Sequence, residues 1–346
     1  MFLENLTLTN FRNYQTLKLK FIPGTNIIIG RNGAGKTNIL EALVVLSNTK
    51  SFRLNNDFSM VKKNEDFAKI ETYFTGHNYK IVINEKNKYY YIDDKMTKNQ
   101  NFIGNVNCVL FEPSDVNLFK ESPKSRRRLL DLELSKIHRE YLYNSFVYYK
   151  LLKEKNNLLK QTKIDTVLLD TIDESLVKPI NIIVAYRNNF IKFISENITN
   201  YYQRLSGTNA VISLKYEACV SKNDLETIKN KLIKYRDKDL IYHTSYLGIH
   251  KEDFKFYYNN QDVSEVASQG QRKMIMIAFK ISLIDYIKKY TNDNPILLLD
   301  DILSELDENN QKRLINLLNC EIQTIITSTD VDKLNLNRNY RLIEIK

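Results

Sequence analysis

The stretch IIIGRNGAGKTNILEAL, residues 27–43, decides the fold of this chain. The run TNIII at Thr25–Ile29, which overlaps its start, is apolar and β-branched and predicts a buried strand. Residues 37–46 predict a helix. G-x-x-x-x-G-K-T joins the two, which is the context that a phosphate-binding loop requires. The alternative is a glycine-containing turn without a ligand, and the flanking strand and helix disfavour it.

A loop of this kind binds phosphate through its backbone and two side chains. Its glycines let N–H groups turn toward the phosphates, and the helix N-terminus adds partial positive charge. Lys36 is predicted to reach the β- and γ-phosphates, and the Thr37 hydroxyl is predicted to bind Mg²⁺. The predicted nucleotide-binding residues of the loop are Gly30, Arg31, Asn32, Gly33, Ala34, Gly35, Lys36, Thr37 and Asn38.

The segment PILLLDDILSELD, residues 295–307, predicts the partner of this loop. Its four apolar residues indicate a buried strand, which ends in two carboxylates. Asp300 at the strand end is predicted to hold Mg²⁺. Asp301 would then orient or deprotonate a water. The alternative is a strand-to-turn junction without a ligand.

The segment ASQGQRKMIMIAFKISLIDYI, residues 267–287, predicts a helix that begins at Ser268. By itself this signal indicates only the start of a helix. A Ser-x-Gly-Gln start, then an Asp-ended strand and then SELD is, however, the order of ABC-type ATPases. In that class this helix start faces the γ-phosphate held by a second subunit, since a helix N-terminus is an anion site. We therefore predict that Ser268, Gly270 and Gln271 contact the ATP of a second copy, with Lys36, Asp301 and Ser268 as the catalytic residues.

The strand predicted in TIITSTD, residues 324–330, separates subclasses of these ATPases. Transporter-type members usually carry a histidine just after it, whereas Thr327, Ser328 and Thr329 stand here. This disfavours a transporter-type ATPase subunit, which remains an alternative. A third possibility is a non-catalytic scaffold that uses ATP only as a ligand. A GTPase is disfavoured because the chain has no Asn-Lys-x-Asp motif.

Over nearly its whole length the chain resembles the RecF family of bacterial recombination and repair ATPases, which are related to the SMC and Rad50 proteins. Besides the ATPase motifs, the resemblance rests on LTLTNFRNYQTLKLKF (6–21), SFR (51–53) and LFEPSDVNLFKESPKSRRRLLD (110–131). The chain departs from the family at LGIHKEDF (247–254), where members usually have Gly-Pro-His-Arg-Asp-Asp. It departs again at Lys155-Asn156, where members often have Arg-Asn.

The resemblance implies a function in recombinational repair, replication and the SOS response to DNA damage. It implies that ATP drives a homodimer onto gapped, single-stranded or double-stranded DNA and that weak, DNA-stimulated hydrolysis releases it. RecO and RecR proteins are the implied partners. By analogy with Rad50-type sites, Arg12 and Arg53 are placed near the nucleotide, with a structural ion pair as the alternative.

Charge is consistent with a nucleic-acid partner. The 346 residues carry a formal net charge of +10, which attracts polyanions, although a solvated surface would give the same balance. The densest basic run gives the predicted DNA contacts Lys124, Arg126, Arg127 and Arg128. On a helix its three arginines cannot share one face, so one or two are expected to pair with acids. Lys150, Lys153 and Lys155 are equally plausible contacts.

The predicted fold class is α/β, with an ABC-type P-loop ATPase head at residues 1–115 and 208–346. Residues 116–207 are predicted to form a mostly helical inserted arm. Two antiparallel helices of about 40 residues would make it about 60 Å long.

The chain shows no sustained heptad pattern, no apolar run of about 18 residues and no secretory signal. Its three cysteines are far apart. We therefore expect a cytoplasmic protein without a membrane partner.

Overall fold

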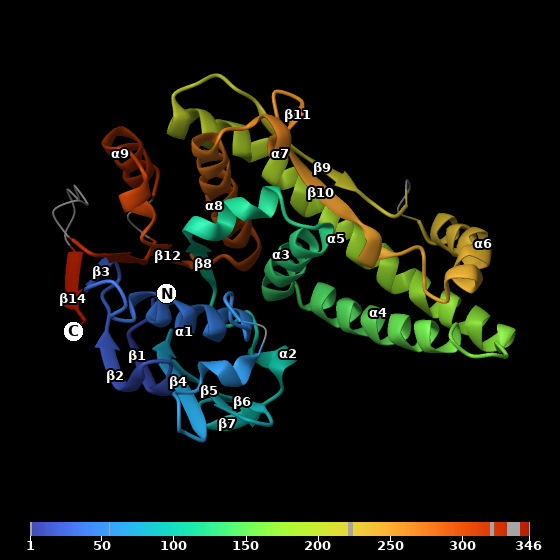
Figure 1. Cartoon of the computed structure of the whole chain (residues 1–346), viewed down its shortest axis with the longest axis horizontal. Coiled ribbons are helices and arrows are strands. Elements are labelled where there is room, and N and C mark those ends of the chain that lie inside the picture. The colour runs from blue at the N-terminus through green and yellow to red at the C-terminus, as the bar shows by residue number, and fades with distance from the viewer. Residues whose placement is uncertain (1, 55, 221–223, 319–321, 331–339, 346) are drawn as a thin grey trace. The chain divides into compact units, whose positions relative to one another are not determined.

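A computed structural model describes residues 2–54, 56–220, 224–318, 322–330 and 340–345. The chain forms two compact units, whose elements are labelled in Figure 1. The first unit comprises Met1–Val116, Asn200–Asn209 and Gln269–Lys346. The second comprises Asn117–Thr199 and Ala210–Ser268. Among the described residues, no helix combines the length and apolarity needed to cross a bilayer.

A five-stranded parallel sheet of the first unit positions the site, in the order β14-β3-β13-β12-β8. Its strands are β3 (Thr25–Ile29), β8 (Cys108–Phe111), β12 (Ile296–Asp300), β13 (Thr324–Ser328) and β14 (Tyr340–Glu344). Strands β12 and β13 are buried at every residue, as expected for a parallel sheet covered on both faces. Because the strands are parallel, the residues that follow β3, β12, β13 and β8 meet at one edge of the sheet.

A six-stranded antiparallel sheet in the order β2-β1-β4-β5-β6-β7 completes the core of this unit. Its strands are β1 (Asn5–Phe11), β2 (Tyr14–Lys20), β4 (Phe67–Phe74), β5 (His77–Asn84), β6 (Lys88–Ile92) and β7 (Lys95–Thr97). Apolar side chains alternate along β1, so one face of the sheet is buried. Helix α1 (Lys36–Asn48) shares a hydrophobic cluster with both sheets. Its run from Ile39 to Leu46 is buried on all sides, which holds the start of α1 rigidly.

The remaining elements of the first unit are helices. They are α2 (Asn99–Phe102), α8 (Gln269–Thr291), α9 (Glu308–Leu317) and 3-10 helices at Asp57–Met60 and Ile302–Glu305. Helix α8 is tied to β8 by Lys280, whose Nζ donates to the Leu110 carbonyl at 2.8 Å and lies 3.1 Å from Asp115. Asp307 caps α9 by accepting a hydrogen bond from the Asn310 N–H at 2.9 Å.

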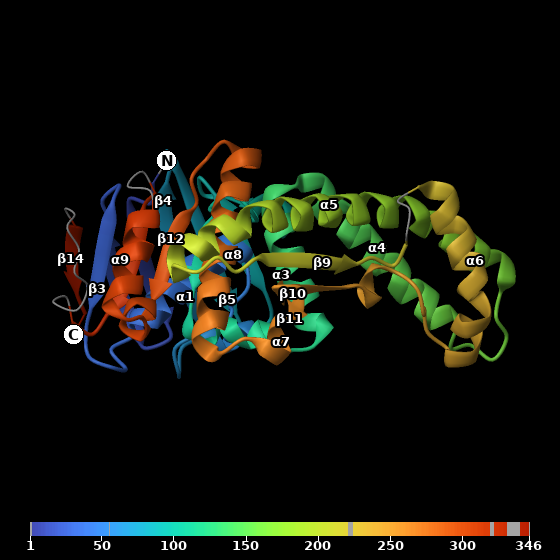
Figure 2. The same ribbon diagram turned by 90° about the horizontal axis from the view of Figure 1, so that it is seen from above.

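The second unit combines helices with a three-stranded antiparallel sheet, β11-β10-β9. Its helices are α3 (Pro123–Ile137), α4 (Arg139–Leu158), most of α5 (Thr166–Ser206), α6 (Leu225–Tyr242) and α7 (Val263–Val266). Its strands are β9 (Ile212–Glu217), β10 (Asp253–Tyr258) and β11 (Gln261–Asp262). Strand β9 lies along α5 (Figure 2). The Thr199 and Ser195 hydroxyls of α5 bond to the backbone of β9. Two further 3-10 helices are Pro113–Phe119 and Ile249–Lys251.

The predicted arm differs from this unit in two respects. Helix α5 has 41 residues, which corresponds to about 60 Å as expected, but α4 has 20, because the helical run breaks at His138 between α3 and α4. The expected boundary also assigned residues 208–346 to the ATPase head. Residues 210–268 instead belong to the second unit, because β9 pairs with β10 and hydrogen-bonds to α5.

The segment 247–254, where the sequence departs from the RecF pattern, belongs to the second unit and is mostly buried. Arg187 of α5 is fully buried and donates to the Ile249 carbonyl at 2.9 Å. The same guanidinium forms ion pairs with Glu252 at 2.5 Å and with Asp131 of α3 at 2.6 Å. The segment therefore joins α3 and α5 through a buried charge network, and Glu252 retains the acidic group that this network requires.

Candidate nucleotide-binding site

The loop between β3 and α1 needs glycine at two positions. Gly35 has φ of +101°, and a Cβ added there would lie 2.5 Å from the Tyr14 hydroxyl oxygen and 2.6 Å from Asn13 Nδ2. A Cβ added at Gly30 would lie 2.7 Å from the Ile345 carbonyl oxygen. These clashes, and the left-handed backbone at Gly35, explain both glycines of the motif.

Lys36 is held inside the curve of this loop. Its side chain is buried, and Nζ donates to the carbonyl oxygens of Gly30 at 2.7 Å and Arg31 at 3.2 Å. These partners are neutral, and a charge-assisted bond to a phosphate oxygen is stronger. This position suits the predicted contact of Lys36 with phosphate, which stays a prediction.

Three side chains from separate strands and helices meet at the sheet edge. The Thr37 hydroxyl donates to Asp300 Oδ1 at 3.1 Å, and the Thr327 hydroxyl donates to the same oxygen at 2.8 Å. Asp300 is buried at the end of β12. A hydroxyl oxygen beside a carboxylate is a donor set that suits Mg²⁺. Thr327 also accepts a hydrogen bond from the Asp301 N–H at 3.0 Å, so it orients both aspartates. The sequence did not predict this function for Thr327.

Arg12 contacts the helix that carries the loop. Its guanidinium donates to both carboxylate oxygens of Glu41 on α1, at 2.8 and 2.6 Å. Glu41 is fully buried and also accepts a hydrogen bond from the Ser51 hydroxyl at 2.5 Å. The structural ion pair that was the alternative for Arg12 is thus present, and its contact with nucleotide stays a prediction.

The Asn-Phe-Arg-Asn-Tyr opening of the chain supports the loop directly. Asn13 Nδ2 and the Tyr14 hydroxyl each donate to the Ala34 carbonyl at 3.2 Å. Asn38 donates to Asn13 Oδ1 at 2.9 Å and accepts from Arg53 at 3.1 Å. Burial raises the pKa of Tyr14 to about 12, so its hydroxyl stays a donor at neutral pH. The sequence reasoning used this opening only for recognition and missed its structural role.

Glu112 follows β8 at the same sheet edge. Burial, together with the negative charges of Asp115 and Asp300, raises the pKa of Glu112 to about 7, against the lowering effects of Ser114 and Lys280. A third carboxyl group therefore lies within electrostatic range of the predicted metal ligand Asp300. The sequence did not predict it because Glu112 belongs to no ATPase motif, although β8 and β12 are neighbouring strands with Leu299 and Phe111 as register partners.

Glu112→Gln is expected to raise the melting temperature at about pH 8 and to change it little at about pH 5, in protein free of nucleotide and divalent metal. The folded carboxyl has a pKa of about 7, whereas its ordinary value is 4.5. The stability that it contributes is complete below pH 4.5 and is lost as the pH rises through 7. Above pH 7 the ionised side chain therefore opposes folding, and glutamine removes that charge.

Thermal unfolding across this pH range checks the prediction. Glu121→Gln, at an exposed position, is the control and is expected to shift little at any pH. Equal shifts for Glu112→Gln at both ends of the range would contradict the raised pKa.

The predicted Ser-x-Gly-Gln segment does stand at the start of α8. Ser268 is exposed just before the helix, and a Cβ added at Gly270 would meet no atom within 4 Å. The helix start opens into a pocket of ≈ 370 Å³ whose lining includes Gly270, Gln271 and Asp307. The structure thus brings the helix start close to the end of SELD. Residues 30–38 are not among the described residues that line this pocket.

Comparison with known proteins shows which ATPases share this arrangement. The family model described as RecF/RecN/SMC N terminal domain matches residues 2–345. DNA replication and repair protein RecF of Lachnoclostridium phytofermentans is 36% identical over 356 residues, which cover 98% of this chain and 95% of that protein. The protein of the same name from Clostridioides difficile is 37% identical over 343 residues, with 96% and 92% covered. The chain belongs to the RecF family.

Solved structures agree with this assignment. A RecF structure described as "recombination mediator protein RecF-ATP in RecFOR pathway" superposes with a TM-score of 0.89 at 31% identity, over 96% of this chain and 95% of that one. An Smc head domain derived from Pyrococcus furiosus, bound to the C-terminal domain of ScpA, superposes with a TM-score of 0.56 at 17% identity, over 96% and 90%. The fold is therefore that of the RecF family, and the Smc head shares its general architecture.

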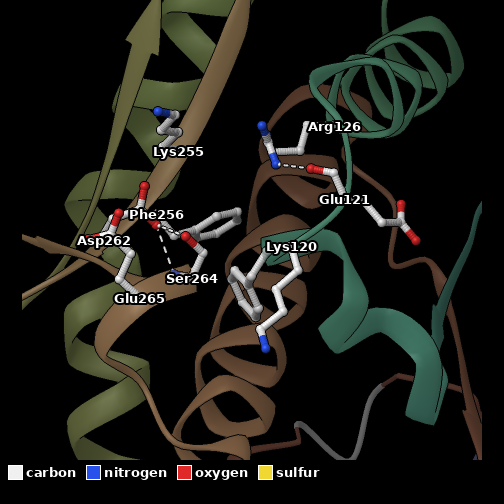
Figure 3. A pocket seen from close by; sticks show the side chains of 9 residues that line it. Lys120, Glu121, Arg126, Lys255, Phe256, Asp262, Ser264 and Glu265 are labelled. Carbon is white, nitrogen blue, oxygen red and sulfur yellow. Dashed lines mark hydrogen bonds between the residues drawn. The ribbon is translucent and has the colours of Figure 1, made fainter.

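The basic run at the start of α3 is divided between the interior and the surface. Arg126 is buried and donates to both carboxylate oxygens of Asp253 at 2.7 Å. Figure 3 shows Arg126 at the wall of a pocket of ≈ 420 Å³, bonded to the Glu121 carbonyl. Arg126 is thus held inside the second unit, which corrects its prediction as a DNA contact. Arg127 donates to the Glu252 carbonyl at 2.6 Å.

Lys124 and Arg128 are exposed and remain predicted DNA contacts of this RecF family member. Lys155 is not exposed. Its ammonium group lies 2.6 Å from the carboxylates of Asp173 and Asp239 and is fully buried. It therefore connects α4 to α5 and α6, and its predicted contact with DNA is wrong.

Arg126→Ala is expected to lower the free energy of unfolding by about 3 kcal/mol, because it leaves the Asp253 carboxylate buried without its bidentate partner. Arg128→Ala is the matched control from the same run, and we expect a change within about 0.5 kcal/mol because its side chain is exposed. Urea unfolding followed by circular dichroism measures both. Equal effects would contradict a structural role for the Arg126–Asp253 pair.

Proposed function

We propose that this RecF family protein is an ATP-dependent DNA-binding protein of recombinational repair and replication. ATP joins two copies around DNA at a gap, and slow hydrolysis stimulated by DNA separates them. The proposal is carried by two features of one chain that would act as two half-sites. One is a phosphate loop with Lys36 and Asp300, and the other is an open helix start at Gly270.

In the first half-site, the described contacts suit ATP and Mg²⁺. The curve of the loop and the Lys36 ammonium would hold the β- and γ-phosphates. Thr37 and Asp300 would hold Mg²⁺, which neutralises charge on the phosphates. Asp301 follows the metal ligand directly and would orient or deprotonate the attacking water.

The second half-site is the start of α8, a helix of 23 residues. Its N-terminus carries partial positive charge, which favours an anion. Ser268 is exposed there and Gly270 leaves open space, so a γ-phosphate from a second copy can approach the backbone closely. Hydrolysis removes that shared anion, so ATP stabilises the dimer and ADP does not.

Similar proteins support the biological setting. The relatives named DNA replication and repair protein RecF point to repair and replication, and the RecF-ATP structure is described as part of the RecFOR pathway. We accordingly propose RecO and RecR proteins as partners of this chain. Its net charge of +10 favours DNA as the polyanion that the dimer binds.

One experiment tests the proposal as a whole. Sedimentation measures the dimer fraction, and filter retention measures binding to gapped DNA, with ATP, a non-hydrolysable analogue, ADP or no nucleotide, each at two salt concentrations. We expect dimers and DNA retention with ATP and the analogue, and monomers otherwise. The slope with salt reports the number of phosphates contacted. A protein that stays monomeric with saturating analogue and DNA would contradict the proposal.

A further inference from the structure

Helix α4 exposes large aromatic rings beside lysines. Tyr143 is 64% exposed and Phe146 is 58% exposed. Lys150, with 68% of its side chain exposed, and Lys153 follow on the same side, since residues three and four positions apart are neighbours on a helix. We call Tyr143, Phe146, Lys150 and Lys153 the α4 stripe. The opposite side of α4, which includes Tyr148, is buried in the second unit.

Exposure of these rings is not needed for folding of the helix. The solvent face of a surface helix ordinarily carries polar side chains, and Glu154 and Asn157 show that α4 follows this rule elsewhere. Leaving 58% of Phe146 in water forfeits roughly half of the about 1.5–3 kcal/mol that full burial of such a side chain gives. Exposed apolar groups with a polar rim commonly mark an interaction surface.

We propose that the α4 stripe binds single-stranded DNA. Bases stack on the rings of Tyr143 and Phe146 while Lys150 and Lys153 contact the phosphates. This inference rests on the proposed function as a DNA-binding protein, and it adds a site for the unpaired strand within a single copy. The positive charges of Lys150 and Lys153 complement the phosphates of single-stranded DNA. Glu154, the acid beside Lys150, lies 4.0 Å away on the surface, and such a pair costs little to separate.

The rings distinguish a single strand from a duplex. Bases in a duplex are paired and stacked on one another, so their faces are closed to a protein side chain. A single strand leaves each base face free, and stacking on aromatic residues is then largely independent of sequence. A duplex would engage only the lysines, through its phosphates. The stripe therefore predicts a preference for the strand exposed in a gap.

Fluorescence anisotropy tests this preference with a labelled oligothymidylate of about 20 nucleotides and a duplex of equal length, in about 50 mM salt. No nucleotide is added. Tyr143→Ala combined with Phe146→Ala is expected to weaken binding of the single strand about tenfold or more. Duplex binding is expected to stay within about twofold, because phosphate contacts supply it. Tyr143→Phe combined with Phe146→Tyr, which keeps both rings, is expected to bind as the wild type does.

Tyr242→Ala, which removes a ring that is 61% exposed on α6, is the control and is expected to bind the strand normally. Melting temperatures establish that all variants are folded. Unchanged single-strand binding by the double alanine variant overturns the proposal and favours a protein partner for the stripe. Equal losses on single strand and duplex also overturn it. ATP-driven dimerisation has no part in this assay, so a failure of the proposed function appears in the sedimentation experiment and a failure of the stripe appears here.

Discussion

Lys36→Ala is expected to lower the rate of ATP hydrolysis about 100-fold or more. The Lys36 ammonium is buried within the curve of the phosphate loop, 2.7 Å from the Gly30 carbonyl oxygen. In this position it can neutralise charge that develops on the γ-phosphate. Alanine leaves the backbone of the loop intact and removes that charge, so the loss falls on both nucleotide binding and hydrolysis.

Lys36→Arg separates these two effects. It retains the positive charge, so some nucleotide binding is expected to persist, but the larger guanidinium does not fit where Nζ meets two carbonyl oxygens. Hydrolysis is therefore expected to fall more than binding. Lys18→Ala, at an exposed position of β2, is the control and should leave both unchanged. Phosphate release and titration with a fluorescent ATP analogue measure the two quantities, and near-normal hydrolysis by Lys36→Ala would remove this lysine from the mechanism.

The parts of the site that could be predicted are those encoded locally. The phosphate loop is read from eight consecutive residues, because the strand, the turn and the helix each leave a signal in the sequence. Thr37 and Asp300 lie 263 positions apart, yet their contact was also predictable. Each belongs to a motif that ends or follows a parallel strand, and the carboxyl ends of such strands share an edge.

Contacts that depend on side-chain packing were not predictable in this way. Arg126 and Arg128 have the same side chain and lie two positions apart, but one is buried against Asp253 and the other is exposed. Lys155 and Lys153 differ in the same manner. Which cation is buried depends on acids brought by distant elements, so basic runs alone overestimate the number of contacts available to DNA.

The length of the second arm helix was overestimated for a related reason, since α4 has 20 residues instead of about 40. A helical period continues across His138, and only the three-dimensional structure shows that α3 ends there and α4 begins. Strand β10, Asp253–Tyr258, was not predicted from the sequence. Its pairing with β9 draws this part of the chain into the second unit.

Ser268→Arg is expected to abolish ATP-driven dimers while leaving ATP binding by the single copy unchanged. Ser268 is exposed at the start of α8, beside the open space at Gly270. A side chain as large as arginine fills the space that a γ-phosphate from the second copy would enter. Retention of gapped DNA with ATP should fall with the dimer fraction, because the proposed clamp needs two copies.

The variant Asp301→Asn is expected to act in the opposite direction. It removes the carboxylate that would activate water but keeps the half-site that binds phosphate, so dimers should persist longer with ATP than in the wild type. Gln261→Arg, which adds the same charge at an exposed position of β11, controls for the new arginine. Sedimentation with ATP measures the dimer fraction of each of the three variants. Normal dimers from Ser268→Arg would place the second half-site elsewhere, because a shared phosphate cannot tolerate an arginine at that helix start.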